Sequence, residues 1–112
     1  MAWKGRRNKY GVAPKSERTF DGIVFDSKAE GLQYLHLKSL KERGQILDIE
    51  LQPVFELLPK PNRVTYRADF RVRWHDGRES VIDVKGMETK VFKLKMKMMR
   101  HFHPDVDVQL IK

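Results

Sequence analysis

The sequence predicts an α/β domain built on a mixed four-stranded sheet with two flanking helices, in the order αβββαβ. Three observations support this fold class. Two segments carry helix start and stop signals, the segments between them alternate apolar and polar residues as strands do, and turn dipeptides separate the alternating runs. The length of 112 residues is that of one domain.

A short hairpin and a helix come first. Residues 18–26 alternate around Asp21-Gly22, a dipeptide that suits a tight turn between two strands. Ser27 followed by Glu30 is a capping-box pattern, which predicts that a helix begins here. The Leu- and Lys-rich run that follows ends before Gly44, a typical helix stop.

Strands occupy the middle of the chain. Residues 46–58 have β-like character, with an edge or a bend at Pro53. Residues 64–75 alternate most cleanly and predict a single strand, which Asp76-Gly77 turns back into a second strand over residues 79–85. A helix over residues 89–102 and a strand over residues 106–111 complete the order.

The turn between the two central strands decides which side chains meet. A two-residue turn would place Asp69 and Asp83 on opposite faces of the sheet. A three-residue loop from His75 to Gly77, with Gly77 left-handed, instead places Asp69 directly opposite Asp83. Cross-strand neighbours have Cβ atoms about 4.5 to 5.5 Å apart, which lets two carboxylates chelate one cation. In that register the opposite, core-facing side is expected to hold Ala68, Phe70, Val72, Ile82 and Val84.

Composition narrows the function. The chain carries 23 Lys and Arg against 15 Asp and Glu, a formal net charge of +8, which favours polyanionic partners such as nucleic acid or an anionic membrane surface. It contains no cysteine, which excludes disulfides, thiol nucleophiles and thiolate zinc sites. Its apolar runs are too short to span a bilayer, and no secretory signal follows Met1. We therefore expect a cytoplasmic protein that binds nucleic acid and no membrane.

The positive charge is concentrated in two segments. Residues 1–19 are predicted to be a basic N-terminal arm that precedes the folded domain of residues 20–112, and residues 90–102 carry five cations and no acid. On a helix, residues three and four apart form a stripe, so the lysines can meet phosphates while Val91, Leu94, Met98 and Phe102 pack on the sheet. The candidate nucleic-acid contacts are Lys4, Arg6, Arg7, Lys9, Lys90, Lys93, Lys97 and Arg100.

The carboxylates and a lysine suggest phosphodiester hydrolysis. This chemistry needs an activated water and neutralisation of charge on the phosphate, which divalent cations held by carboxylates supply. A strand places Asp83 and Lys85 on one face, where an acid and an ammonium can address the same phosphate. Val84 between them offers its backbone carbonyl.

These residues resemble a known family. Glu30 on the first helix, the run Tyr66-Arg67-Ala68-Asp69-Phe70, and then Asp83-Val84-Lys85-Gly86 are similar to the PD-(D/E)xK nuclease superfamily. Within it, the chain resembles phage Holliday-junction resolvases of the endonuclease I type and a family of small phage proteins of uncharacterised function. The similarity runs from about Phe20 to Ile111 and departs from the superfamily at Ala68, where its name has Pro.

The resemblance implies a restriction-endonuclease-like core and a structure-specific DNA endonuclease that depends on Mg²⁺ or Mn²⁺ and cuts branched DNA. It implies Asp69 and Asp83 as metal ligands, with Glu30 as a further ligand directly or through water, and Lys85 as the water-orienting residue. Gln52 is a secondary candidate. A junction cutter makes two symmetric incisions, so a homodimer is expected, in the cytoplasm of the host if the protein is phage-encoded.

Simpler explanations stay open for each residue. Glu30 can be only the capping partner of Ser27, Asp69 can pair with neighbouring arginines, and Asp83 with Lys85 can be a surface ion pair. The lysine stripe can be a solvated helix face. The rival functions are a non-catalytic nucleic-acid-binding accessory protein and a nuclease of the same fold that acts on duplex, flap or RNA substrates.

The histidines and aspartates near the C-terminus could in principle bind a transition metal. Pro104 interrupts the spacing of the residues that would form it, and no thiolate is near, so a solvated terminus is favoured. The residues concerned are His101, His103, Asp105 and Asp107.

Overall fold

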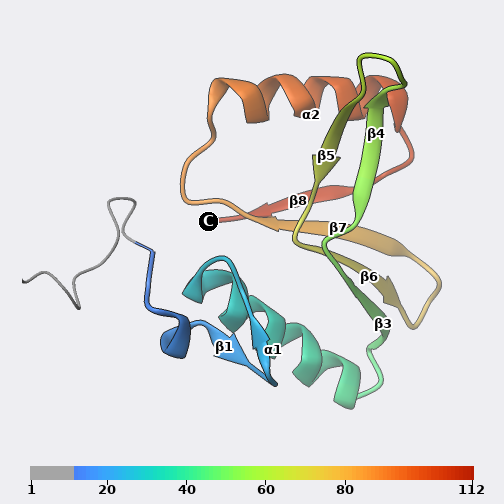
Figure 1. Cartoon of the computed structure of the whole chain (residues 1–112). Helices are drawn as coiled ribbons and strands as arrows, with labels where there is room; N and C mark the ends of the chain where they lie inside the picture. The colour runs from blue at the N-terminus through green and yellow to red at the C-terminus, as the bar shows by residue number, and fades with distance from the viewer. Residues whose placement is uncertain (1–11) are drawn as a thin grey trace, which may run out of the picture. The chain divides into compact units, whose positions relative to one another are not determined.

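The computed structural model describes residues 12–112, so the predicted contacts Lys4, Arg6, Arg7 and Lys9 lie outside the described residues. The chain divides into two compact units, one ending at Ser39 and the other comprising Leu40–Lys112. The elements (Figure 1) are a 3₁₀ turn (Lys15–Glu17), β1 (Thr19–Phe20), β2 (Ile23–Val24), α1 (Lys28–Glu42), β3 (Ile46–Leu51), β4 (Val54–Leu58), β5 (Val64–Arg67), β6 (Phe70–Trp74), β7 (Glu79–Val84), α2 (Lys90–Phe102) and β8 (Val108–Ile111).

The first unit contains the predicted hairpin. β1 and β2 pair antiparallel, and Asp21 and Gly22 both have positive φ, +53° and +76°, as a tight hairpin turn requires. The Asp21 carboxylate accepts a hydrogen bond from Tyr34 Oη at 3.0 Å and pairs with Lys38, both on α1. The hairpin is thereby attached to the helix through polar contacts.

Helix α1 begins and ends where the sequence predicts. The Ser27 hydroxyl accepts the backbone N–H of Glu30 at 3.0 Å, which is one half of a capping box. At the other end Gly44 has a φ of +80°, its N–H donates to the carbonyl of Lys41, and the N–H of Gln45 donates to that of Leu40. This pair of bonds is a Schellman motif, which satisfies carbonyls that the helix leaves without partners.

The second unit contains the predicted mixed sheet, with strand order β3-β6-β7-β8. β6 pairs antiparallel with both β3 and β7, whereas β8 lies parallel to β7. The sequence order α1, β3, β6, β7, α2, β8 is therefore the expected αβββαβ, with an additional two-stranded sheet of β4 and β5 inserted between β3 and β6. Among residues 12–112, neither helix combines the length and the apolar content that crossing a bilayer needs.

The prediction of one continuous strand over residues 64–75 is wrong, because the chain bends after β5. Leu51 pairs with Phe70 in one sheet and Val54 with Arg67 in the other. Backbone hydrogen bonds bridge the gap, from Gln52 to the Asp69 carbonyl at 2.9 Å and from Ala68 to the Pro53 carbonyl at 3.0 Å. The register is thus unbroken, and β3–β4 with β5–β6 form one long bent hairpin whose far half leaves the sheet toward α2 (Figure 1).

The physical cause of the bend lies in the partner strand. Pro53 has no N–H to donate, and Gln52 adopts a left-handed φ of +53°. A ladder cannot continue flat through such a pair, so the strand opposite must turn with it. Apolar alternation in residues 64–75 carries no trace of this, because the alternation continues across the bend.

Helix α2 packs on a core that combines the sheet and the bent hairpin. Thr89 caps the helix, its hydroxyl accepting the N–H of Phe92 at 3.1 Å. The rings of Phe92 and Tyr66 meet edge-on, with centroids 6.2 Å apart. The buried members of this core are Phe55, Leu57, Tyr66, Ala68, Val81, Phe92 and Met99.

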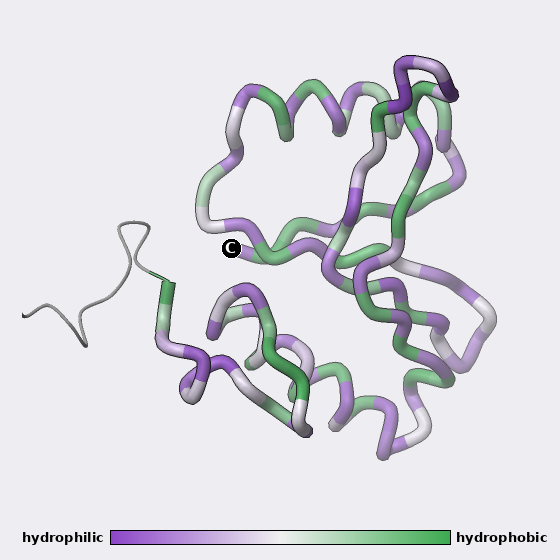
Figure 2. The backbone as a smooth tube through the Cα atoms, viewed as in Figure 1, coloured by the Kyte–Doolittle hydropathy of each residue, from purple (hydrophilic) through white to green (hydrophobic). Residues whose placement is uncertain are grey.

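The predicted apolar stripe of α2 is wrong for three of its four residues, because Met98 alone of the four packs against the core. Val91 is 63% exposed, Leu94 57% and Phe102 49%, whereas Phe92 and Met99 are buried. The helix is rotated because it covers the aromatic side chains of the β4–β5 hairpin as well as the sheet, and sequence alone had merged that hairpin into the sheet. Hydrophobic and hydrophilic residues consequently alternate along the whole of α2 in Figure 2.

The predicted common core face is also corrected by the bend. Phe70, Val72 and Ile82 are buried as expected. Ala68, however, belongs with Tyr66 to the core beneath α2, which also contains Val81 from the opposite face of β7.

Candidate functional site

The loop between β6 and β7 has the three residues that the site requires. The N–H of Trp74 donates to the carbonyl of Arg78 at 2.8 Å, and Gly77 has a φ of +91°. The Asp76 carboxylate accepts hydrogen bonds from the backbone N–H and the Nε of Arg78, at 3.0 and 2.7 Å. The predicted register is confirmed, with partners Phe70 and Ile82, Arg71 and Val81, Val72 and Ser80, and Arg73 and Glu79.

Asp69 lies at the bend, one residue before β6 begins. Continuing the β6–β7 register by one position places it opposite Asp83. Its side chain accepts the backbone N–H of Val84 at 2.8 Å, while its carbonyl accepts the N–H of Gln52. Because β5 leaves the sheet here, a carboxylate oxygen satisfies an N–H of β7 that has lost its neighbouring strand.

Asp83 is a buried carboxylate at the end of β7, only 1% exposed. Its Oδ2 accepts a hydrogen bond from Tyr66 Oη at 2.5 Å and lies 3.8 Å from Lys85 Nζ. Burial raises the pKa of Tyr66 far above its usual value, and the hydrogen bond to Asp83 and the charges of Asp83 and Asp69 raise it further. The phenol therefore stays protonated and serves as a fixed donor to the carboxylate.

Lys85 is held on two sides. Its ammonium lies 4.7 Å from the centroid of the Phe92 ring, within the range of a cation–π contact, and 3.8 Å from the carboxylate of Asp83. Its backbone N–H donates to the carbonyl of Ile111 at 2.9 Å, which fixes this end of β7 against β8. The half-buried ammonium is thus positioned beside Asp83 rather than extended into solvent.

The oxygen donors suit a hard divalent cation. Mg²⁺ is commonly bound by one or two carboxylates, with water and substrate phosphates completing its coordination. Asp69, just before β6, and Asp83 on β7, together with the backbone carbonyl of Val84, match that donor set. Within residues 40–112 no group of three or more His, Cys, Asp and Glu side chains is placed to hold a metal ion.

Among residues 12–112, the C-terminal histidines and aspartates form no such group either. His103 Nε2 instead contacts the carbonyl of Glu56 at 2.7 Å, and its ring packs edge-on against Phe55. Asp107 accepts a hydrogen bond from the Gln109 side chain at 3.0 Å. These contacts give the residues structural roles at the end of α2 and the start of β8.

The remaining predicted residues have defined positions. Glu30 is buried in the first turn of α1, where its backbone N–H is capped by Ser27, and its role as a ligand stays a prediction. Gln52 forms the bend opposite Asp69, so its backbone has a structural role, and its side chain stays a candidate. The cations on α2 are exposed: Lys90, Lys93, Lys97 and Arg100.

Sequence reasoning missed Tyr66 as a functional residue. The alternation of residues 64–75 predicts for Tyr66 only an apolar position of a strand. The only signal that could have drawn attention to it is its place in the run that ends in Asp69-Phe70.

Residues 7–112 match the model of a family described as "Protein of unknown function (DUF1064)", and the chain belongs to that family. No curated protein and no solved structure matches the chain. The family's description names no activity, so the resemblance to nucleases stays a prediction.

Proposed function

We propose that this member of the DUF1064 family is a metal-dependent endonuclease with a restriction-endonuclease-like core, which hydrolyses the backbone of branched DNA. One observation supports the proposal above all others. The three-residue loop brings Asp69 opposite Asp83, and Lys85 lies 3.8 Å from the second of these carboxylates. Two acids and a lysine at the end of neighbouring strands are the groups that phosphodiester hydrolysis needs.

Each side chain has a separate task in this proposal. Asp69, Asp83 and the carbonyl of Val84 would hold Mg²⁺ or Mn²⁺, which when bound supplies an activated water and neutralises charge on the leaving oxygen. The Tyr66 hydroxyl fixes the orientation of Asp83. Lys85 presents its ammonium beside that carboxylate, where it orients the attacking water and balances the charge of the phosphate.

The substrate class is supported by charge and by the resemblance. The net charge of +8 and the exposed cations of α2 suit a phosphate backbone. The preference for Holliday junctions rests on the resemblance, as does the homodimer, since two symmetric cuts need two sites related by a twofold axis.

Substitution of the site tests catalysis. Asp83→Asn and Lys85→Ala should each abolish cleavage of an end-labelled four-way junction in Mg²⁺, while junction binding in gel-shift assays persists. Asp105→Asn is the matched control, because this exposed acid lies between α2 and β8, and it should cleave normally. Cleavage by Asp83→Asn at the wild-type rate would refute the assignment. Absence of cleavage by the wild-type protein on every substrate would favour the non-catalytic binding module.

A second experiment tests the substrate. Four-way, three-way, flap, duplex and RNA substrates are compared at equal concentration and at one salt concentration, because affinity for nucleic acid depends steeply on salt. The proposal requires the four-way junction to be cut fastest. Equal rates on all substrates would contradict the junction preference and leave a nuclease of broader specificity.

A further inference from the structure

A cleft opens directly beside Lys85, between β5 and the first two turns of α2. Its volume is about 580 Å³. Every charged side chain that lines it is a cation, namely Arg67, Lys85 and Lys95, and the neutral phenol of Tyr66 forms part of its floor. The cleft is therefore positively charged, and two of its lining residues, Tyr66 and Lys85, lie next to the Asp83 carboxylate.

Two of these cations have no acidic partner within the described chain. Lys85 is engaged by Asp83 and the Phe92 ring. Arg67 and Lys95, by contrast, form no ion pair with any of residues 12–112. Most exposed arginines of the neighbouring strands do pair, as Arg71 does with Glu50 at 3.2 Å. Unpaired cations gathered around a hollow are expected where an anion binds.

The walls of the cleft also expose apolar surface. Val54 on β4 is 53% exposed and Val91 on α2 is 63% exposed, and both line the cleft. A site for inorganic anions alone gains nothing from such side chains, whereas the sugars and bases of an unpaired strand present apolar faces to them. The volume is in the range of pockets that enclose one small ligand, so it suits a short stretch of a single strand and excludes a duplex.

We propose that this cleft holds one unpaired DNA strand next to the cut, with Arg67 and Lys95 as positioning residues that bind its phosphates. The inference rests on the proposed nuclease function and deepens it. Arg67 precedes Asp69 by two residues, and Lys95 lies on α2 one turn beyond Phe92, which contacts Lys85. A strand bound by this pair would pass the ammonium of Lys85, which lies 3.8 Å from the carboxylate of Asp83. The protein would thus select DNA in which a strand has separated, as at a branch point.

Binding in the absence of divalent cations tests the cleft without any cleavage. Fluorescence anisotropy is recorded in EDTA with single-stranded DNA, duplex DNA and single-stranded RNA of the same length and sequence. The double variant Arg67→Gln/Lys95→Gln should bind single-stranded DNA about tenfold more weakly. Its log–log salt slope should fall by roughly 1.4, since each phosphate contact to a single strand contributes about 0.7.

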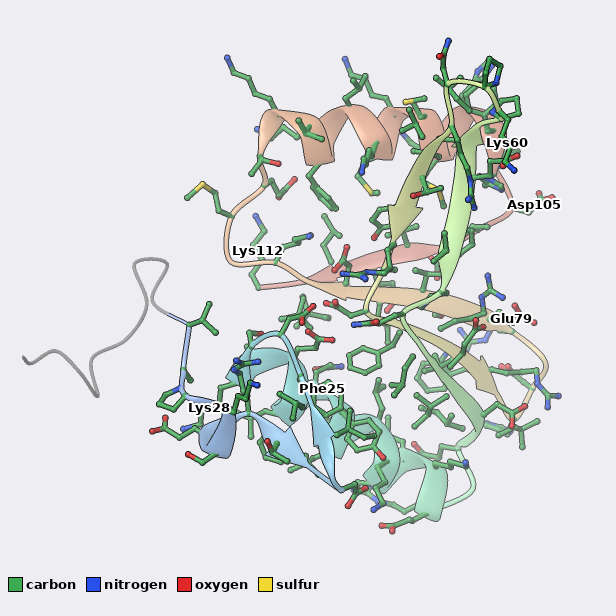
Figure 3. The ribbon with its side chains drawn as sticks, in the orientation of Figure 1. Phe25, Lys28, Lys60, Glu79, Asp105 and Lys112 are labelled. Atoms are coloured by element: carbon green, nitrogen blue, oxygen red, sulfur yellow. The ribbon has the colours of Figure 1, made fainter. Side chains whose placement is uncertain are left out.

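The matched control is Lys60→Gln/Arg63→Gln, which removes the same charge from the turn that joins β4 to β5. Figure 3 shows Lys60 at that end of the hairpin, away from the four-stranded sheet. This control should keep the wild-type slope. Lys95→Met, which preserves the aliphatic stem, should weaken binding as Lys95→Gln does, and urea unfolding verifies that each variant is folded. A slope that falls equally in variant and control would overturn the proposal.

The comparison of single-stranded DNA, duplex DNA and RNA decides which nucleic acid the cleft binds. Duplex DNA bound as tightly as single-stranded DNA, and weakened equally by the double variant, would overturn the claim of an unpaired strand. Tighter binding of RNA would overturn the choice of DNA. If the cleft variants lose binding while the wild-type protein never cleaves, the cleft is a site for an unpaired strand and the proposed nuclease function is refuted. If Asp83→Asn abolishes cleavage while the cleft variants bind normally, the cleft alone is refuted.

Discussion

Replacing Tyr66 with Phe removes a single oxygen from the centre of the candidate site. The ring would keep its contacts with Phe55 and Phe92, whose centroids both lie 6.2 Å from it. The hydroxyl, however, is the donor of the 2.5 Å hydrogen bond to Asp83, a carboxylate that is 1% exposed. Because the carboxylate is buried, Tyr66→Phe isolates the value of one buried, charge-assisted hydrogen bond.

The expected loss of stability follows from that geometry. Hydrogen bonds to charged groups contribute about 1.5 to 3 kcal/mol, and a buried acceptor left unsatisfied loses the upper part of this range. Lys85 remains 3.8 Å from Asp83 and compensates in part. We therefore expect Tyr66→Phe to lower the free energy of unfolding by about 2 kcal/mol near neutral pH.

Urea denaturation measures this loss, and a double-mutant cycle with Asp83→Asn assigns it to the pair. The cycle should give most of the loss as coupling energy. A change below about 0.5 kcal/mol, the range of ordinary surface substitutions, would refute the reasoning, because it would mean that the hydroxyl and the carboxylate do not meet in the buried site.

The same substitution has a signature at high pH. The pKa of Tyr66 is raised in the folded protein, while the unfolded chain has the ordinary value of about 10. Below that pH both states carry the proton and the contribution is complete. Above it the unfolded state loses its proton first, so the stability of the wild-type protein falls by up to about 1.4 kcal/mol per pH unit through this group. Tyr66→Phe should lack this component, and parallel alkaline profiles of the two proteins would contradict the assignment.

Four further substitutions test the packing and the loop. Phe92→Ala should cost about 3 to 5 kcal/mol in urea unfolding and Val91→Ala under about 0.5, because Phe92 is buried and Val91 is 63% exposed; the reverse order would restore the stripe expected from sequence. Gly31→Ala should destabilise by about 1 to 3 kcal/mol despite its better helix propensity, since a Cβ would lie 2.2 Å from the Phe20 ring, and a gain in stability would show that the hairpin does not pack there. Gly77→Val, at a φ of +91°, should cost at least about 1 to 2 kcal/mol by the same measurement, and an unchanged midpoint would contradict the three-residue loop.

Local signals were sufficient for the turns and the helix ends. The Asp21-Gly22 turn, the Ser27 cap and the Gly44 stop each depend on the conformational preference of one or two residues, which sequence states directly. The three-residue loop could be selected for a different reason. Two registers were possible, and only the three-residue loop brings Asp69 opposite Asp83.

Tertiary packing decided what sequence could not. Helix α2 has apolar residues on two faces, the predicted stripe on one and Phe92, Met96 and Met99 on the other. Which face is buried depends on the hairpin that the helix covers. Phe92 is buried while Val91 and Leu94 are exposed, because the hairpin of β4 and β5 places the Tyr66 ring against Phe92. The alternation in residues 64–75 correctly predicts extended structure. It cannot predict the bend, because an alternating pattern has period two whether or not the strand changes sheets.

The bend brings Tyr66 to the two aspartates of the candidate site. In a flat strand the side chains of Tyr66 and Asp69 would point to opposite faces, because they are an odd number of residues apart. Here the hydroxyl of Tyr66 reaches Asp83 while the side chain of Asp69 bonds to the N–H of the residue after it. That arrangement needs the strand to turn between the two residues, and the turn is imposed from across the ladder by Gln52 and Pro53. Pro53, where the sequence predicts an edge or a bend, is thus a determinant of the site, although its side chain contributes no chemistry.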